Sequence, residues 1–383
     1  MQPFKLNDQG NKLLQIAERI ATETISKHAR DVDGQARFPR ENIDAMRKAG
    51  LLGLVSATEV GGHGQGLRAA AAVCERFARD CPSTAMITKM HFCGTAVIEA
   101  HGGKEIRREI AAGKHLTTLA FSEYGSRSHF WVPVSTATPM GKDNIKLDAN
   151  KQLITSAGEC DIYVWSSKPA AAEGLSSIWW VPAKTRGLSV GNKFEGLGLR
   201  GNASAPISAE TAQIPRANLL GEDGKGFDVM MGVVMPWFSV QNLAISVGMM
   251  EGVLARTISH VTGQGYDYSG AKISSFPQVR GYVARMRTRI DMCRALLIDA
   301  LDAIESGRDD AVLRVLQSKV SGAETSLEVH DLAMRVCGGA AYRKDNAVER
   351  FFRDSRAASV MAPVSDALWD FIGKAVCGLP LFE

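Results

Sequence analysis

The sequence predicts an α+β protein in which a β region lies between two helical regions. Residues 1–117 and 226–383 carry apolar side chains at helical spacing. Residues 118–225 instead carry short runs of β-branched and aromatic residues that alternate with turn residues. A chain of 383 residues is long enough for two or three domains. We therefore predict an N-terminal α-helical domain (1–117), a middle β-domain (118–225) and a C-terminal α-helical bundle (226–383).

In the N-terminal region, the apolar spacing predicts helices over Leu6 to Arg30, Glu41 to Ala49 and Leu67 to Asp80. We expect Ser83 to cap the next helix. The glycine-rich loop Gly61 to Gly66 lies between predicted helices. A dinucleotide-binding fingerprint needs a strand directly before its glycines, so this loop does not indicate one.

The middle region reads as a small β-barrel or a β-sandwich, because its predicted strands are short and regularly spaced. A boundary follows at Pro215 and the glycines between 221 and 226. In the last region, the length of two amphipathic helices predicts an antiparallel bundle. These helices span Val279 to Glu305 and Asp310 to Val336. The six predicted strands are Thr117 to Phe121, Val132 to Ala137, Ile145 to Leu147, Ile162 to Trp165, Ile178 to Val181 and Ile207 to Ala209.

Composition narrows the function classes. The net charge of +4 suits phosphorylated small molecules such as nucleotides or coenzyme A, but it is too small to indicate a nucleic-acid binder. The seven cysteines show no C-x-x-C spacing, so we expect reduced thiols and no metal site. No apolar run reaches about 18 residues, which predicts no membrane span. The polar opening segment lacks the pattern of a leader, so we expect a cytoplasmic protein.

Five local motifs, in order along the chain, resemble the acyl-CoA dehydrogenase family over nearly the full length. Ser122 to Ser128 (Ser-Glu-Tyr-Gly-Ser-Arg-Ser) is similar to that family's Thr/Ser-Glu-Pro-Gly-Ala-Gly-Ser stretch. The resemblance implies a middle β-barrel and a C-terminal four-helix bundle. The other four motifs are Ile154 to Ser156, Leu197 to Asn202 with Leu219 to Phe227, Arg335 to Gly339, and Glu349 to Asp354.

The resemblance also implies FAD as the cofactor. Small residues and hydroxyls let backbone amides approach a flavin. By resemblance, Ser122 hydrogen-bonds the isoalloxazine, Ser128 the pyrophosphate, and Ile154 and Thr155 lie on the other side of the flavin. Glycine is needed where the backbone comes close to a ligand. The resemblance implies that Gly338 and Gly339 receive the adenylate part of an FAD bound mainly by a neighbouring subunit.

A shared FAD implies a homo-oligomer, either a dimer or a tetramer. Arg335 stands where the family has Gln, and its guanidinium can pair with a phosphate. The alternative for Arg335 is an ordinary surface or salt-bridged residue.

The chain departs from the family at the catalytic base, which is usually a Glu shortly after the Arg353 and Asp354 pair. That position falls on Ala362. Some members place the base in the first helix of the last domain, and this position falls near Phe238. Neither position carries a carboxylate.

Other residues are candidates for the catalytic role that the absent carboxylate has in the family. Arg127, His129 and Trp131 put charged and aromatic groups beside the expected flavin and thioester. His91 lies on the helix that lines the acyl pocket in this family. Histidine can exchange protons near neutral pH. The alternative is that both histidines only hydrogen-bond within the fold.

Three functions follow from the resemblance. The favoured one is a flavin-dependent oxygenase that takes O2 as co-substrate and uses a flavin peroxide or N-oxide. Relatives of this kind act on cyclic acyl-CoA thioesters in natural-product biosynthesis, including tropone formation. The second is an acyl-CoA dehydrogenase with a relocated base. The third is a non-catalytic flavin-binding protein.

Overall fold

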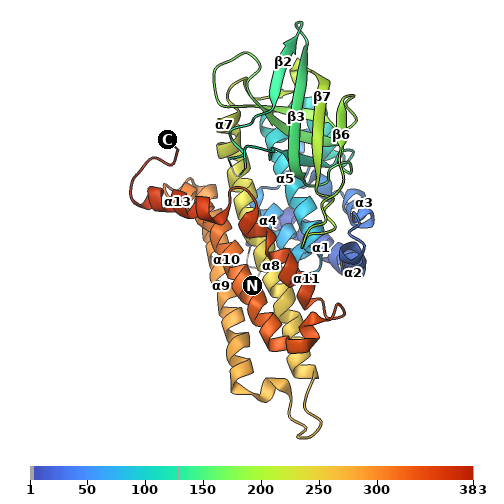
Figure 1. Ribbon diagram of the computed structural model, residues 1–383, viewed down its shortest axis with the longest axis vertical. Helices are drawn as coiled ribbons and strands as arrows, with labels where there is room; N and C mark the ends of the chain where they lie inside the picture. The colour runs from blue at the N-terminus through green and yellow to red at the C-terminus, as the bar shows by residue number, and fades with distance from the viewer. Residues whose placement is uncertain (1–3, 128, 383) are drawn as a thin grey trace.

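The computed structural model describes residues 4–127 and 129–382. Two β-sheets lie at one end of an elongated molecule, and long helices run away from them toward the other end (Figure 1). The N-terminal helices pack along one side of this arrangement. The order of helical, sheet and helical regions confirms the predicted fold class.

The N-terminal region is helical, as predicted, and its first two helices are joined by a π-helical turn at Ala21–Ile25. The predicted cap at Ser83 is wrong, because this helix starts at Pro82, whose fixed φ suits a first helical position. The Ser83 hydroxyl instead accepts a hydrogen bond from the Gly201 backbone N–H, at 3.2 Å. The helices are α1 (Asp8–Ile20), α2 (Ser26–Gly34), α3 (Arg40–Lys48), α4 (Leu67–Ala78), α5 (Pro82–His101) and α6 (Lys104–Ala111).

The middle region forms two four-stranded sheets with the orders β1-β4-β5-β8 and β2-β3-β7-β6. Of the two predicted arrangements, two separate sheets correspond to a sandwich more closely than to one closed barrel. The long antiparallel pairing of β3 with β7 extends both strands well beyond their predicted apolar centres. The strands are β1 (Thr117–Ala120), β2 (Thr136–Met140), β3 (Asn144–Ile154), β4 (Ile162–Ser167), β5 (Ser177–Pro182), β6 (Leu188–Val190), β7 (Ala205–Pro215) and β8 (Leu219–Leu220).

The C-terminal region is built around α8, which packs against α9 and α10 of the bundle and also against α4. The shorter α11 and α13 pack on α10 and complete the bundle. The helices α4 and α5 of the N-terminal region also contact α8 of the C-terminal region. The two regions are therefore in direct contact, and the domain boundaries near residues 117 and 225 remain a proposal. The helices are α7 (Gly226–Val229), α8 (Met235–Gly263), α9 (Pro277–Ser306), α10 (Ala311–Cys337), α11 (Val348–Ser355), α12 (Ala357–Val360) and α13 (Ser365–Val376).

A π-helical turn at Met230–Val234 joins α7 to α8, so the chain is helical from Gly226 to Gly263. Among the described residues, this is the one helix that is long and apolar enough to cross a membrane. However, 67% of its apolar window is buried inside the protein. Its packing against α4, α9 and α10 identifies it as the central core helix.

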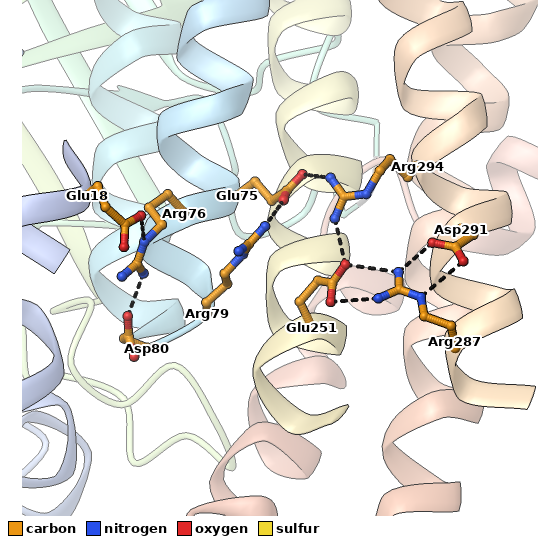
Figure 2. Close-up of polar contacts among 9 residues, drawn as sticks. All are labelled: Glu18, Glu75, Arg76, Arg79, Asp80, Glu251, Arg287, Asp291 and Arg294. Carbon is orange, nitrogen blue, oxygen red and sulfur yellow. Dashed lines mark hydrogen bonds and ion pairs between the residues drawn. The ribbon is translucent and has the colours of Figure 1, made fainter. Parts of the chain in front are cut away.

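Ion pairs connect the N-terminal helices to the bundle (Figure 2). Glu75 of α4 accepts a hydrogen bond from Arg294 of α9 at 2.7 Å, and Arg294 also donates to Glu251 of α8 at 2.8 Å. Burial alone would raise the pKa of Glu251, but hydrogen bonds from Arg287 and Arg294 outweigh it and hold that pKa below its usual value. Three helices from two regions therefore share one charged network.

Candidate active site

A large cavity of about 820 Å³ lies where the middle sheets meet α5, α8 and the segment after α11. Its size falls in the range of roughly 300–1,000 Å³ that is usual for small-molecule sites. Most of its wall is apolar. The described residues that border it include Met86, Met90, Phe121, Ser122, Arg127, Ile154, Thr155, Gly198, Arg200, Phe238, Arg356, Met361, Ala362 and Pro363.

Backbone pairing brings the first two sequence motifs together in this cavity. The N–H of Gln152 donates to the carbonyl of Ser122 at 2.9 Å, and the N–H of Tyr124 donates to the carbonyl of Asn150 at 3.3 Å. The segment that starts at Ser122 therefore runs beside the end of β3, next to Ile154 and Thr155. All three of these predicted flavin-binding residues border the cavity.

Glu123, the neighbour of Ser122, is committed to the fold. Its buried carboxylate accepts a hydrogen bond from Lys151 Nζ at 2.5 Å and others from the hydroxyl of Ser135 and the backbone N–H of Val134. Burial acts to raise the pKa of Glu123, but the charge and hydrogen bond of Lys151 hold it below its usual value. This carboxylate is thus ionised and already paired, so it is poorly suited to accept a substrate proton.

Two further motifs dock onto each other at the rim. The buried Asp354 carboxylate accepts a hydrogen bond from the N–H of Leu199 at 2.6 Å. A Cβ on Gly198 would lie 2.5 Å from the carbonyl oxygen of Arg353, so only glycine allows this approach. The loop around Gly198 and the start of the segment that carries Ala362 are therefore held against each other.

Both positions expected for a catalytic carboxylate lie at the cavity. Ala362 and Phe238, the residues that the motif alignment assigns to these positions, both border it. Among the described residues that line the cavity, Glu123 is the only Asp or Glu, and it is paired with Lys151. The lining therefore offers no carboxylate that is available as a base.

The structure does not bring His91 to the cavity. Its Nε2 lies 2.8 Å from the carbonyl oxygen of Leu52, and its Nδ1 lies 3.1 Å from the backbone nitrogen of Thr117. The N–H of Thr117 can only donate, so Nδ1 accepts and the ring proton resides on Nε2. Burial lowers the pKa of His91 to about 4. His91 has the contacts of a neutral residue that ties α5 to β1.

Of the candidates Arg127 and His129, only Arg127 is among the described residues that line the cavity. Arg127 borders the cavity and has a positive φ of 51°. His129 is exposed, lies outside the described cavity wall and packs against the edge of Trp131, with 5.2 Å between ring centroids. Trp131 in turn packs against Phe371 of α13. Ser128, the predicted pyrophosphate partner, lies outside the described residues.

The residues predicted to bind the adenylate part of FAD are not among the described residues that line this cavity. Gly338 and Gly339 follow α10, and neither has an atom within 4 Å of an added Cβ, so the space above them is open. Cys337, just before them, contacts Thr257 of α8, which is 19 residues beyond Phe238. At 1.5 Å per residue this separation is about 28 Å. Arg335 is exposed and lies near the ring of Tyr282.

Two buried lysines behind the cavity wall are not predicted by the sequence motifs. Lys89 of α5 lies with its Nζ 3.6 Å from the ring centroid of Phe238. Lys319 of α10 donates to the carbonyls of Ala358, Met361 and Pro363 at 2.7–3.0 Å. For Lys89, the signal that could have found it is a single lysine in a helical stretch that has no other Lys, Arg, Asp or Glu until Glu99.

The cavity suits a flavin by the chemistry of its wall. The hydroxyls of Ser122 and Thr155 and the polar backbone beside them meet apolar side chains such as Phe121, which fits a flat ring with polar edges. Arg127, Arg200 and Arg356 border the same cavity, and arginine suits phosphate groups. The residues present therefore fit FAD.

Comparisons with known proteins agree with this geometry. Residues 7–113 match the N-terminal domain of acyl-CoA dehydrogenases, and residues 224–377 match the C-terminal domain. Cyclohex-1-ene-1-carbonyl-CoA dehydrogenase of Geobacter metallireducens is 27% identical over 380 residues, which cover 97% of this chain and 98% of that protein.

Solved structures share the fold over almost the whole chain. Butyryl-CoA dehydrogenase from Megasphaera elsdenii superposes with a TM-score of 0.90 at 19% identity, covering 97% of this chain and 99% of the other. PigA, solved with FAD and proline, superposes with a TM-score of 0.89 at 20% identity, covering 98% and 99% of the two chains. Two domain matches, full-length relatives and the cavity described above agree that the chain belongs to the acyl-CoA dehydrogenase family of flavin-dependent oxidoreductases.

Proposed function

We propose that the protein is an FAD-dependent oxygenase of an acyl-CoA-type thioester, with O2 as co-substrate. The observation that carries this proposal is a cavity that joins the flavin-binding segments yet has alanine and phenylalanine at both expected base positions. A positioned base typically contributes about 10²–10⁴ to the rate of proton removal. Without it, ordinary dehydrogenation of an unactivated acyl group would be slow.

In this proposal the residues of the chain bind and orient FAD, and they shield the reacting atoms from water. When bound, FAD supplies the redox and oxygen chemistry. The hydroxyls of Ser122 and Thr155 hold and orient the ring. Arg127 and Arg356 neutralise phosphate charge at the rim. The apolar wall around Phe121 and Phe238 excludes water from the reacting atoms.

A cyclic acyl group with an acidic α-proton is the substrate class we propose. Such a thioester needs less help from a side-chain base to lose its proton. The name of the Geobacter relative, which refers to a cyclic acyl-CoA, supports a ring-shaped acyl group. A natural-product pathway is the setting that we propose for such a substrate.

An acyl-CoA dehydrogenase with a relocated base is the second candidate. Its support is the names of the relatives, which are dehydrogenases and an acryloyl-CoA reductase. The position of His91 argues against that residue as the base, since both ring nitrogens are engaged within the fold. His129 would need to turn toward the cavity from its contact with Trp131.

We also propose that FAD is shared between subunits of a dimer or tetramer. Arg335, Gly338 and Gly339 are too far along the helical bundle from Phe238 for one compact site. Their open surroundings suit the adenylate of an FAD whose ring is held by Ser122 and Thr155 of a neighbouring copy.

The test is turnover of the FAD-loaded protein with cyclic acyl-CoA thioesters under ¹⁸O2 and, separately, without oxygen. An oxygenase consumes O2, and ¹⁸O enters the product. Anaerobic turnover with an artificial electron acceptor and no ¹⁸O incorporation would identify the dehydrogenase instead. A protein that retains FAD but does neither with any of the thioesters would support the non-catalytic alternative.

A further inference from the structure

Two buried lysines lie behind the inner wall of the cavity. They lie near the positions where relatives are expected to carry a catalytic carboxylate. Lys89 and Lys319 are both buried, and the hydrogen-bond acceptors described for them are an amide oxygen and backbone carbonyls, not carboxylates. Lys89 lies directly behind Phe238, and Lys319 lies directly behind Met361 and Pro363. These cavity-lining residues include and flank the two expected base positions.

Three backbone carbonyls accept hydrogen bonds from Lys319, but burial and the nearby Lys89 lower its pKa to about 7, so this amine is only partly protonated at neutral pH. Lys89 is different. Among the described residues, the oxygen that accepts its hydrogen bond is Oδ1 of Asn242, at 3.1 Å, and its ammonium also lies over the face of Phe238. A neutral amide and an aromatic ring compensate a buried ammonium far less than a carboxylate does.

The groups around Lys89 also add little negative charge. The titratable neighbours that act on it are the buried thiols of Cys74 and Cys93, and Lys319 is a second cation nearby. Burial raises the pKa of both thiols, so they are neutral near pH 7. The pKa of Lys89 is lowered to about 8 by burial, which still leaves the amine mostly protonated at neutral pH.

We infer that Lys89 projects its charge through the ring of Phe238 into the cavity, which makes the site selective for an acyl thioester that carries an enolate or another anionic oxygen on its acyl part. Phe238 is half-buried, with Lys89 against one face and cavity space beside it. This inference rests on the proposed function only for the acyl-thioester class of ligand. Because Lys89 acts through Phe238, it is a positioning residue and not a catalytic one.

The size of the effect follows from distance. A ligand atom stacked on the free face of Phe238 would lie roughly 7 Å from Nζ of Lys89, given ordinary contact distances. At the effective dielectric of a partly buried site, a unit charge at that distance favours an anionic ligand by on the order of tenfold or more. The charge therefore favours binding of an acidic substrate that has already released its α-proton to bulk solvent, with the electron pair held on the enolate oxygen.

The test compares two probes with the FAD-loaded, oxidised protein: acetoacetyl-CoA, which forms an enolate, and butyryl-CoA, which does not. The ultraviolet absorbance of bound acetoacetyl-CoA, measured against pH, gives the fraction of this probe that is in the enolate form. Binding titrations give the affinities of the protein for acetoacetyl-CoA and for butyryl-CoA. In Lys89→Met, we expect the enolate-to-keto ratio of bound acetoacetyl-CoA to fall by on the order of tenfold. Butyryl-CoA affinity should change much less.

Two further variants keep the test decisive. Lys89→Arg retains the charge and should restore the enolate ratio. Asn242→Asp keeps Lys89 but neutralises its field, so it should lower the ratio as Lys89→Met does. Loss of both affinities in parallel, or an unchanged enolate ratio in the Met and Asp variants, would overturn the inference. None of these readings requires turnover, so they stand apart from the outcome of the ¹⁸O2 experiment.

Discussion

At the scale of single residues, the neutral state of His91 is specified by its partners. The carbonyl of Leu52 needs a donor, and the N–H of Thr117 needs an acceptor, so a protonated ring would lose its bond to Thr117. This explains without reference to catalysis why a histidine stands in the helix that lines the pocket. A sequence motif cannot distinguish this role from that of a base, because both use the same side chain.

His91 should therefore make the protein sensitive to acid. Its folded-state pKa of about 4 lies below the ordinary value of 6.5, so the unfolded chain takes up the proton first as the pH falls. The resulting stability is present above pH 6.5 and is lost as the pH falls toward 4. We expect His91→Gln to show a shallower loss of unfolding free energy over this window, measured by urea denaturation.

The exposed His129 provides the control for this experiment. Substitution His129→Gln removes an exposed histidine that packs against Trp131, so it tests whether the effect of His91→Gln depends on the buried site of His91. An equally steep loss of stability in wild type and His91→Gln would show that the acid sensitivity comes from other groups.

The second prediction at this scale concerns Ala362. Since this position borders the cavity, a carboxylate placed there would face the thioester. We expect Ala362→Glu to raise anaerobic dehydrogenation of a simple acyl-CoA, by up to about 10²-fold, as a positioned base can. The measurement is reduction of an artificial acceptor, with Ala362→Gln as the control of equal size. No gain in a variant that still binds FAD would contradict our placement of the base position.

At the scale of elements, the ion-pair network of Figure 2 fixes α4 and α9 against the central α8. Glu75 is almost fully buried and accepts hydrogen bonds from Arg294 and Arg79. Removing one partner of such a pair leaves the other charge poorly compensated. We expect Glu75→Gln to lower the unfolding free energy by about 2 kcal/mol, a value reduced from that of a fully buried pair because Arg79 is partly exposed.

Asp291 offers the matched comparison in the same network. It contacts Arg287 at the exposed edge, so Asp291→Asn should cost at most about 0.5 kcal/mol by the same denaturation measurement. Equal losses in the two variants would mean that burial does not set the strength of these contacts.

The docking of the rim loop on α11 gives another prediction at this scale. In Gly198→Ala the new methyl group would lie 2.5 Å from the carbonyl oxygen of Arg353, so the loop must shift. We expect at least a tenfold loss of FAD affinity, because an Å-scale displacement at a binding surface is costly. Gly196→Ala, where the nearest atom is 3.3 Å away, is the control and should bind FAD nearly as well as wild type.

At the scale of the whole molecule, the helical and β regions could be predicted because each has its own periodicity. The family resemblance implied that Ser122 and Thr155 contact one cofactor, and the pairing of residue 122 with residue 152 beside β3 brings both residues to one cavity. Other features depend on contacts between distant segments, which no local pattern records. Examples are the pairing of Glu123 with Lys151 and the position of Lys89 behind Phe238.

The separation between the two groups of FAD-binding candidates leads to the last prediction. One group, with Ser122 and Thr155, borders the cavity, whereas Gly338 and Gly339 lie near the far end of α10. If one FAD contacts both groups, it must bridge two copies of the chain. Variants Thr155→Trp and Gly339→Trp should then each bind little FAD when purified alone.

Co-expression of these two variants distinguishes shared from unshared binding. In a mixed dimer, one site combines both defects, while the other combines the intact Thr155 region of one copy with the intact Gly339 region of the other. Random pairing should thus restore FAD to about a quarter of the sites, measured as flavin absorbance per chain. Restoration requires the cofactor to cross the subunit boundary, because a site built within one chain would remain defective in every copy. Flavin content that stays at the level of the separate variants would therefore contradict the sharing of FAD between subunits.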